Sequence, residues 1–457
     1  MIDNKKIVMD IQDTDITVDL IEKLLDIHTP IVSNRFKILD NYYKGKHDIL
    51  NRQIADKDKP NNKPITNFCS YITDTLTGFF VGKPVSYYSN NKEYLNILTE
   101  IFELNDEQAK NHDLAHKASI KGQSFELVYL DEDGLINFDT LDTDSVIMVY
   151  DSTVKNNVNM AIRYYTIHNY LNNTDTINID VYTKTNIYHY VKEDKNITFI
   201  NTEEHYFKEV PIVEYSNNRY RMSDFEQIIT LNDMYNKNIA DIANDIEYFS
   251  NAYLALSQAE GTNGDDIKAI NQNRVIILPN GGDAKFLTKQ LNDAVVNNHR
   301  NNLSDDIHKV SYVPDLSKEI NANVSGTALK TKMFTTTDIL VSKERKFKKA
   351  IQKRIRLITN ILNLKGNDFD PNDIKINFHY NLPSELFGDA DSISKMGTIL
   401  SQRTMLQNIG IEDIDEEIEQ IKKEQESTFD LDTIQDTELK INSNGYAEHK
   451  HSGDSDE

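Results

Sequence analysis

The chain has 457 residues, of which 39% are hydrophobic and 27% are charged, and its formal net charge at pH 7 is -23. This length predicts two or three sub-domains, and the acidic balance argues against a protein that holds duplex DNA tightly, because such binding needs clustered cations. A single cysteine, Cys69, excludes an intramolecular disulfide framework and a metal site built from several cysteines, so we expect a small buried apolar residue. The sequence shows no signal peptide pattern and no apolar run of about 18 residues, so we expect no membrane span.

The first part of the chain has helical patterns. Apolar residues repeat at helical spacing between Ile16 and Leu50. A polar stretch at 56–64 predicts a loop, and a second helix is predicted over Ile65–Phe80, ending before Pro84. Another helical run covers Tyr94–Gly122.

Alternating apolar and polar residues then predict strands. Ser124–Leu130 and Leu135–Leu141 flank Asp131-Glu132-Asp133-Gly134, a hairpin signal with glycine where a positive φ is expected. Further strands are predicted at Ser145–Tyr150, Met160–Ile167, Thr176–Tyr182, Thr185–Val191 and Ile197–Asn201. The fold class that we expect is therefore α+β, with antiparallel meanders.

The pattern changes at Ser223-Asp224-Phe225-Glu226, which is a capping box. It predicts a helix of roughly 35 residues that runs to about Gln258 and is broken by Gly261–Asp266. The later predicted elements are strands at Arg274–Leu278 and Ala284–Thr288, a helix at Asp293–Tyr312, a loop at Asp315–Gly326, a long helix at Thr327–Leu364, a strand at Asp373–Leu382 and a helical hairpin at Asp389–Glu426.

Charge is unevenly distributed in this second half. Val341–Asn360 holds eight Lys or Arg against Glu344 alone, whereas Glu412–Glu457 holds 16 acidic residues against 4 lysines. The basic run includes Lys343, Arg345, Lys346, Lys349 and Lys353. It has two interpretations: a face that is solvated or pairs with acidic neighbours in an oligomer, or a face that contacts DNA phosphates. The acidic residues after Glu426 predict a disordered tail.

Catalytic and metal motifs are weak. His112-Asp113-Leu114-Ala115-His116 places two histidines one helical turn apart, but a zinc protease motif needs Glu after the first His, and no third ligand follows. Gly281-Gly282-Asp283-Ala284-Lys285 lacks the spacing of a phosphate-binding loop and predicts a hairpin turn. We find no catalytic constellation and expect no metal or cofactor.

Several blocks of sequence, taken in order, resemble the portal proteins of long-tailed phages that infect Gram-positive bacteria. The blocks are Tyr42-Tyr43-Lys44-Gly45-Lys46-His47, Asn61-Asn62-Lys63-Pro64-Ile65-Thr66-Asn67, Gly78-Phe79-Phe80-Val81-Gly82-Lys83-Pro84-Val85, Ala118-Ser119-Ile120-Lys121-Gly122 with Glu126, and Val324-Ser325-Gly326-Thr327-Ala328-Leu329-Lys330 leading into Glu344-Arg345-Lys346-Phe347. Each block alone is unspecific, but their order and spacing over roughly residues 35–425 are specific.

The resemblance implies a portal fold with an α+β wing, long stem helices, a small clip that contains β-strands, and a helical crown. The implied boundaries are 1–222 for the N-terminal part of the wing, 223–259 for a stem helix, 260–292 for the clip, 293–313 for the second stem helix, 314–326 for the tunnel loop, 327–385 for a long wing helix and strand, 386–426 for the crown and 427–457 for the acidic tail.

The resemblance also implies the function. Twelve copies would form a ring at one capsid vertex of the virion, after assembly in the host cytoplasm. The partners would be the chain itself, the terminase large subunit, the head-tail connector, the major capsid and scaffolding proteins, and double-stranded DNA that passes through without sequence-specific contact. The tunnel-loop residues that would face the DNA are Lys318, Asn321, Asn323 and Ser325.

Two other interpretations stay open at this point. One is a different head-assembly component, such as a minor capsid protein. The other is a metal-dependent hydrolase built on His112 and His116.

Overall fold

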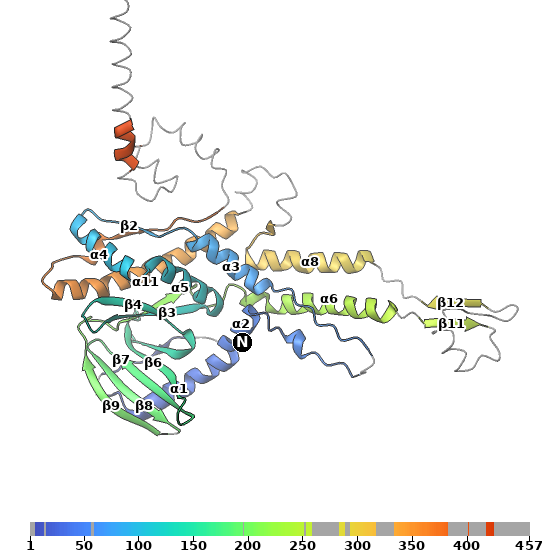
Figure 1. Ribbon diagram of the computed structural model, residues 1–457, viewed down its shortest axis with the longest axis horizontal. Helices are drawn as coiled ribbons and strands as arrows, with labels where there is room; N and C mark the ends of the chain where they lie inside the picture. The colour runs from blue at the N-terminus through green and yellow to red at the C-terminus, as the bar shows by residue number, and fades with distance from the viewer. Residues whose placement is uncertain are drawn as a thin grey trace, which may run out of the picture. The chain divides into compact units, whose positions relative to one another are not determined.

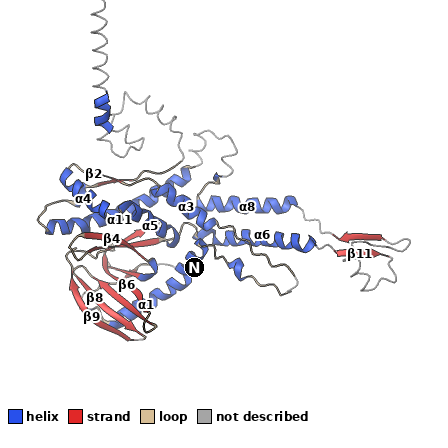
Figure 2. Cartoon of the chain, viewed as in Figure 1, coloured by secondary structure: helices blue, strands red, loops and turns tan. Residues whose placement is uncertain are grey.

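The computed structural model describes residues 5–12, 15–55, 59–194, 196–250, 253–257, 283–287, 293–316, 333–382, 401 and 417–424. The chain divides into two units, residues 1–381 and 382–457. The first unit contains every strand of the described residues and nearly all of their helices (Figure 2). Of the second, the structure describes Leu382, Ser401 and a helix at 417–424.

A six-stranded sheet forms one layer of the first unit (Figure 1). Its strands are β1 (Ile7–Val8), β5 (Val146–Tyr150), β6 (Val158–Asn169), β7 (Thr174–Tyr182), β8 (Asn186–Glu193) and β9 (Asn196–Glu204). The spatial order is β1-β5-β6-β7-β8-β9, with β1 parallel to β5 and every other pair antiparallel. The strands predicted between residues 145 and 201 are confirmed, whereas β1 was not predicted.

Both faces of this sheet are covered near β5, whose five residues are all buried. On one face, Ile21 and Leu24 of α1 (Val18–Ile31) pack against Ile147 and Ile162. On the other face, Tyr150 and its neighbours pack against the three-stranded sheet described next. A strand that is covered on both faces has a continuous run of apolar residues in its sequence, and Val146–Tyr150 is such a run.

The second sheet has the order β10-β3-β4, with β10 (Ile212–Ser216), β3 (Gln123–Leu130) and β4 (Ile136–Leu141). The predicted hairpin is confirmed: Gly134 has φ +74°, and the Asp131 carboxylate accepts the amides of Asp133 and Leu135 at 3.0 and 2.8 Å. The predicted helical run Tyr94–Gly122 is two helices, α4 (Lys92–Leu104) and α5 (Glu107–Lys121). They separate at Asn105 and Asp106 because Asp106 is in the left-handed region, with φ +52°.

Two long helices lie side by side in the part of the unit away from the sheets (Figure 1). They are α6 (Ile229–Ser250) and α8 (Asp293–Ser311), and between them along the chain β11 (Tyr253–Ser257) pairs antiparallel with β12 (Asp283–Leu287). The helix predicted to reach Gln258 is therefore too long, because residues 253–257 form main-chain hydrogen bonds with a strand about 30 residues away, which local periodicity does not detect. The strand predicted at Arg274–Leu278 lies outside the described residues.

The last long helix is α11 (Phe334–Leu364), which packs on β10, β3 and α3 (Phe68–Val81). The predicted strand at Asp373–Leu382 is confirmed as the shorter β13 (Lys375–Asn377), which pairs with β2 (Ser86–Tyr88). Most of the predicted crown at 386–426, and the whole tail at 427–457, lie outside the described residues. In the parts of the chain that the structure describes, no helix has the length and apolarity that a membrane crossing requires.

Candidate functional site

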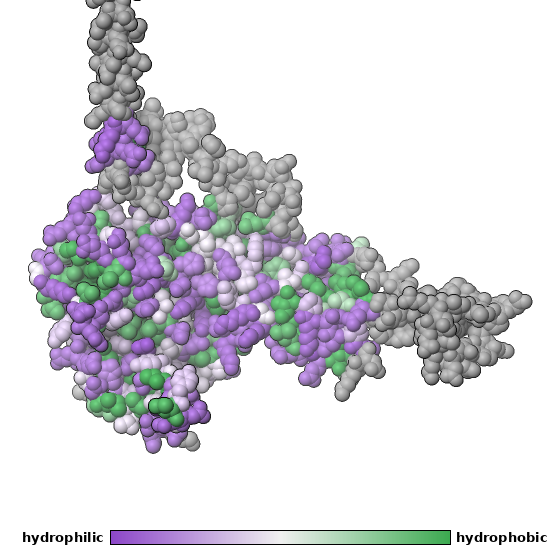
Figure 3. Space-filling view, viewed as in Figure 1, coloured by the Kyte–Doolittle hydropathy of each residue, from purple (hydrophilic) through white to green (hydrophobic). Residues whose placement is uncertain are grey.

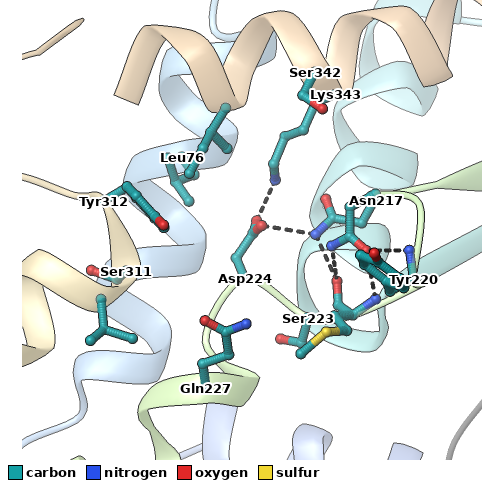
Figure 4. Close-up of a pocket in the computed structure, with 14 residues that line it drawn as sticks. Leu76, Asn217, Tyr220, Ser223, Asp224, Gln227, Ser311, Tyr312, Ser342 and Lys343 are labelled. Carbon is teal, nitrogen blue, oxygen red and sulfur yellow. Dashed lines mark hydrogen bonds and ion pairs between the residues drawn. The ribbon is translucent and has the colours of Figure 1, made fainter. Parts of the chain in front are cut away.

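The functional site that the structure best defines is a junction between the sheets and the paired helices α6 and α8. We call the segment from Asn217 to Ile228, which connects β10 to α6, the junction segment. It lies between the end of α8, the first turns of α11 and helix α3 (Figure 4). The segment is held from two sides by two buried ion pairs.

The first ion pair joins Glu226 to Arg35. Glu226 accepts the Ser223 amide at 3.0 Å, which is the reciprocal half of the predicted capping box. Arg35 donates to both oxygens of the same carboxylate, from Nε at 3.0 Å and from Nη2 at 2.7 Å, and its side chain is only 2% exposed. A π-helical segment, Val32–Phe36, carries Arg35 at a point where its Nη2 also donates to the Arg221 carbonyl at 2.7 Å. The start of α6 is therefore fixed to the N-terminal helices.

The second ion pair joins Asp224 to Lys343 of α11, and both side chains are less than a tenth exposed. The Asp224 carboxylate also accepts the Ser119 hydroxyl at 2.6 Å and the Asn217 amide nitrogen at 2.8 Å. These donors compensate the carboxylate for the water that it loses on burial. The second pair therefore fixes α11 to the junction segment.

A pocket of about 210 Å³ opens beside this ion pair. Its wall includes Leu76 of α3, Tyr220 and Asp224 of the junction segment, Tyr312 after α8, and Lys343 (Figure 4). Tyr220 is 72% exposed and Tyr312 is 49% exposed, so two aromatic rings are open to solvent at the pocket. Tyr312 also has a positive φ of 60°, an uncommon conformation for tyrosine.

The chain on either side of residues 317–332, which include most of the predicted tunnel loop (314–326), comes together beside this pocket. The Thr336 hydroxyl of α11 donates to the Tyr312 carbonyl at 2.6 Å, and the Tyr71 hydroxyl donates to the Pro314 carbonyl at 3.3 Å. The chain between Tyr312 and Thr336 therefore leaves and returns at one place. The predicted loop residues Lys318, Asn321, Asn323 and Ser325 lie outside the described residues.

The predicted basic face on α11 needs a correction. Lys343 faces inward to Asp224, and the Lys353 ammonium donates to the Ile212 carbonyl at 2.8 Å, where burial lowers the pKa of Lys353 to about 8. Neither ammonium is available for DNA or for another subunit, because each is used within the chain. Arg345, Lys346 and Lys349 are exposed.

The sequence analysis did not predict the structural role of Arg354, which lies on the same helix. It is fully buried, donates to both oxygens of Glu126 at 2.8 and 2.6 Å, and donates to Glu107 at 2.9 Å. The guanidinium also lies 4.6 Å from the centre of the Phe138 ring. Helical spacing could have indicated this role, because Lys343 and Arg354 fall on the same face as Phe347, Ile351 and Ile358.

The candidate metal and thiol residues have structural contacts. His116 Nε2 lies 2.9 Å from the Tyr43 hydroxyl and 3.4 Å from Asp74, and His112 stacks on His116 with a centroid distance of 6.3 Å. Among the described residues, no three His, Cys, Asp or Glu side chains are grouped so that they could hold a metal ion. Cys69 is fully buried, as predicted, and burial raises the pKa of its thiol.

Known proteins resemble the chain over most of its length. A family profile described as "Phage portal protein, SPP1 Gp6-like" matches residues 21–429. The chain is 23% identical over 437 residues to the portal protein of Bacillus phage SPP1, covering 89% of this chain and 86% of that protein. It is 24% identical over 447 residues to the portal protein of Clostridium phage phiCD119, covering 89% of this chain and 96% of that protein.

Two solved structures resemble the chain at lower sequence identity than these two portal proteins. A chain from the neck of an empty GTA particle has a TM-score of 0.49 and 10% identity, covering 76% of this chain and 90% of that chain. A chain from the neck of the native GTA particle has a TM-score of 0.45 and 11% identity, covering 75% and 89%.

Proposed function

The chain belongs to the SPP1 Gp6-like family of phage portal proteins, and from this premise we propose that twelve copies close into a ring at one vertex of the capsid, through which DNA enters and leaves the head. A portal subunit is a structural component of the virion. We prefer this proposal to the two other interpretations, a minor capsid protein and a hydrolase built on His112 and His116, because the portal family profile covers residues 21–429. We assign the chain no catalytic activity of its own and no cofactor.

The observation that carries the ring is the pair α6 and α8. Met234 and Ile246 of α6 and Val295 of α8 are 53%, 60% and 61% exposed, so apolar side chains of both helices face solvent in a single copy. Helices of this length gain most of their stability from packing, and identical neighbours in a closed ring would cover the second face of each helix.

The described elements can be assigned to the parts of the portal fold. The two sheets with α1, α2 (Lys37–Tyr43), α3, α4, α5 and α11 would correspond to the wing, α6 and α8 to the stem, and β11 with β12 to the clip. Residues 314–326 would correspond to the tunnel loop, 327–385 to the long wing helix with its strand, and 386–426 to the crown. During packaging the clip side would contact the terminase large subunit and afterwards the head-tail connector, while the wing would contact the major capsid and scaffolding proteins.

The charge of the chain suits a channel through which DNA slides. A net charge of -23 repels phosphates, so DNA would pass without strong binding. The polar side chains of Lys318, Asn321, Asn323 and Ser325 could make transient contacts that do not depend on sequence. The double attachment of the junction segment would hold the base of this loop still while DNA moves past it.

Electron microscopy of the purified full-length chain tests the ring. We expect particles with a central hole, about twelvefold symmetry and a native mass that is a multiple of 52.6 kDa. A chain that stays monomeric at high concentration would refute the proposal.

The loop assignment has a separate test. Deleting Asn321–Ser325 should leave rings intact but reduce the packaging or retention of DNA in particles. Deleting Leu171 and Asn172, two exposed residues of the turn between β6 and β7, is the control and should change neither, because Tyr170 and Asn173 still connect the paired residues Asn169 and Thr174. If the loop deletion abolished ring formation, the loop would be a subunit interface.

A further inference from the structure

Three exposed leucines lie at the end of the first unit that is away from α6 and α8 (Figure 1). Leu104 and Leu364 are the last residues of α4 and α11, and they are 59% and 58% exposed. Leu135 follows the turn between β3 and β4 and is 46% exposed. A single exposed leucine is common on protein surfaces and needs no function, so these three are informative only if they lie together.

Hydrogen bonds join the segments that carry these leucines. The Asn105 side chain donates to the Ile136 carbonyl at 3.1 Å, and the Lys365 ammonium donates to the Gly134 carbonyl at 3.0 Å. Asn105 and Lys365 each directly follow one of the two helix-end leucines, and Gly134 and Ile136 flank Leu135. In the space-filling view, hydrophobic side chains gather over the end of α11 (Figure 3). We call the three leucines the leucine patch.

Acidic side chains dominate the segments that carry the leucine patch. Residues 103–106, 130–135 and 363–370 contain seven Asp or Glu and one Lys. Two further lysines are nearby: Lys110 donates to the Phe138 carbonyl, and Lys208 follows Phe207, whose carbonyl accepts from Asn360. Even with these two, seven acidic residues stand against three lysines. The acids that are exposed in the three segments include Glu103, Asp106, Glu132, Asp133 and Asp368.

This charge indicates which kind of partner fits the leucine patch. An apolar patch with a polar rim is typical of a protein–protein contact. The acidic rim repels phosphates, so neither DNA nor an anionic lipid surface fits it. A second copy also fits poorly, because the chain has 23 more acidic than basic residues. Lys and Arg side chains beside an apolar stripe, as an amphipathic helix presents them, complement both the leucines and the rim.

We propose that the leucine patch is a docking site for a basic amphipathic helix of another protein. The apolar stripe of that helix would cover the three leucines, and its Lys or Arg side chains would pair with the acidic rim. The inference goes beyond the proposed function, since it concerns one copy of the chain and does not depend on the ring.

Two synthetic peptides test the site on the full-length protein. Both are about 18 residues long, which is five helical turns, and both contain the same Leu, Ala and Lys residues. One has Leu at the spacing of an amphipathic helix, and the other has the same residues in scrambled order. Because their charge is equal, general attraction to an acidic protein is equal too. By fluorescence anisotropy we expect the amphipathic peptide to bind at least about tenfold more tightly. Equal affinities would overturn the proposal.

Substitution then locates the binding. Leu135→Gln combined with Leu364→Gln removes two apolar side chains without changing the charge, and should reduce the preference for the amphipathic peptide to less than about threefold. The matched control is Val154→Gln combined with Leu171→Gln, since these residues are 104% and 95% exposed in two turns of the six-stranded sheet. The control should keep the tenfold preference. A preference that survives in the patch variant would place the binding elsewhere and contradict the proposal.

Charge gives a second measurement. Glu103→Gln combined with Glu132→Gln should weaken binding of the amphipathic peptide by about threefold or more at low salt, and by less at high salt. A peptide with Glu in place of every Lys should not bind, and equally tight binding of that peptide would show that the acidic rim does not select the partner.

The outcomes also separate this inference from the ring. If the leucine substitutions changed the oligomeric state, the patch would be a contact between copies and the proposal would be wrong. A chain that binds the amphipathic peptide as expected but forms no rings would overturn the ring and leave the docking site intact.

Discussion

Asp224 and Lys343 form an ion pair across 119 residues of sequence, and their side chains are 7% and 5% exposed. The pair joins the junction segment before α6 to α11. Together with Arg35 and Glu226 it fixes the start of α6 both to α11 and to the N-terminal helices.

Removing the cation of this ion pair should lower the free energy of unfolding. Lys343→Met leaves Asp224 buried without its charge partner, and we expect the free energy of unfolding to fall by about 3 to 5 kcal/mol in urea denaturation. Arg345→Met removes an exposed cation two residues further along and should change it by less than about 0.5 kcal/mol. Equal effects of the two substitutions would show that the Asp224 pair contributes little.

The buried cluster at Arg354 should tolerate the loss of one carboxylate better than the other. Glu126 makes two hydrogen bonds to Arg354, whereas Glu107 makes one, and burial raises the pKa of Glu107 although Arg354 opposes this. We expect Glu126→Gln to lower the free energy of unfolding by about 3 kcal/mol or more, and Glu107→Gln by clearly less.

The pH dependence of the stability of Glu107→Gln checks the direction of the Glu107 pKa shift. With its pKa raised in the folded state, Glu107 binds a proton more readily when folded than when unfolded, so its contribution to stability increases as pH falls through the folded pKa. Glu107→Gln should lack this contribution, and an unchanged pH profile would contradict it.

Two glycines should respond to alanine in opposite directions. Gly122, which ends α5, has φ +84°, and a Cβ there would lie 1.9 Å from the Arg221 carbonyl oxygen. Gly122→Ala should therefore destabilise the chain by several kcal/mol or prevent folding. Gly78→Ala within α3 meets nothing within 4 Å and should raise the free energy of unfolding by about 0.5 to 1 kcal/mol. Thermal denaturation of both variants measures the contrast.

His28 of α1 should make the stability of the chain sensitive to acid. It is 5% exposed, Nδ1 lies 2.9 Å from the Tyr164 hydroxyl, and burial lowers the pKa of His28 from 6.5 to about 4. Below pH 6.5 the unfolded state takes up a proton that the folded state does not, so this contribution is lost as pH falls from 6.5 towards 4. We expect roughly 2 kcal/mol of the loss in stability between pH 7 and pH 5 to disappear in His28→Gln. His112→Gln, at an exposed position, should keep the wild-type profile.

Sequence alone predicted the α+β class, the strands from 123 to 204, the hairpin at Asp131–Gly134 and the positions of the long helices. These features depend on the periodicity of apolar residues and on turn chemistry, which act over a few residues. The same local signals failed at the end of α6, where strand pairing between β11 and β12 replaced a continued helix. They also gave no indication of β1, whose two residues form a strand because β5 lies beside them.

Tertiary structure decided what the basic residues of α11 do. Eight cations in one stretch gave the sequence its clearest charge feature, but charge counting cannot tell which of them meet acids 119 to 228 residues away. Folding brings Asp224 to Lys343 and Glu126 to Arg354, and it leaves Arg345, Lys346 and Lys349 exposed. Ion pairs between distant residues depend on long-range proximity, which the sequence specifies only through the complete fold. This is why the family could be inferred from ordered sequence blocks, while the partners of Lys343 and Arg354 required the structure.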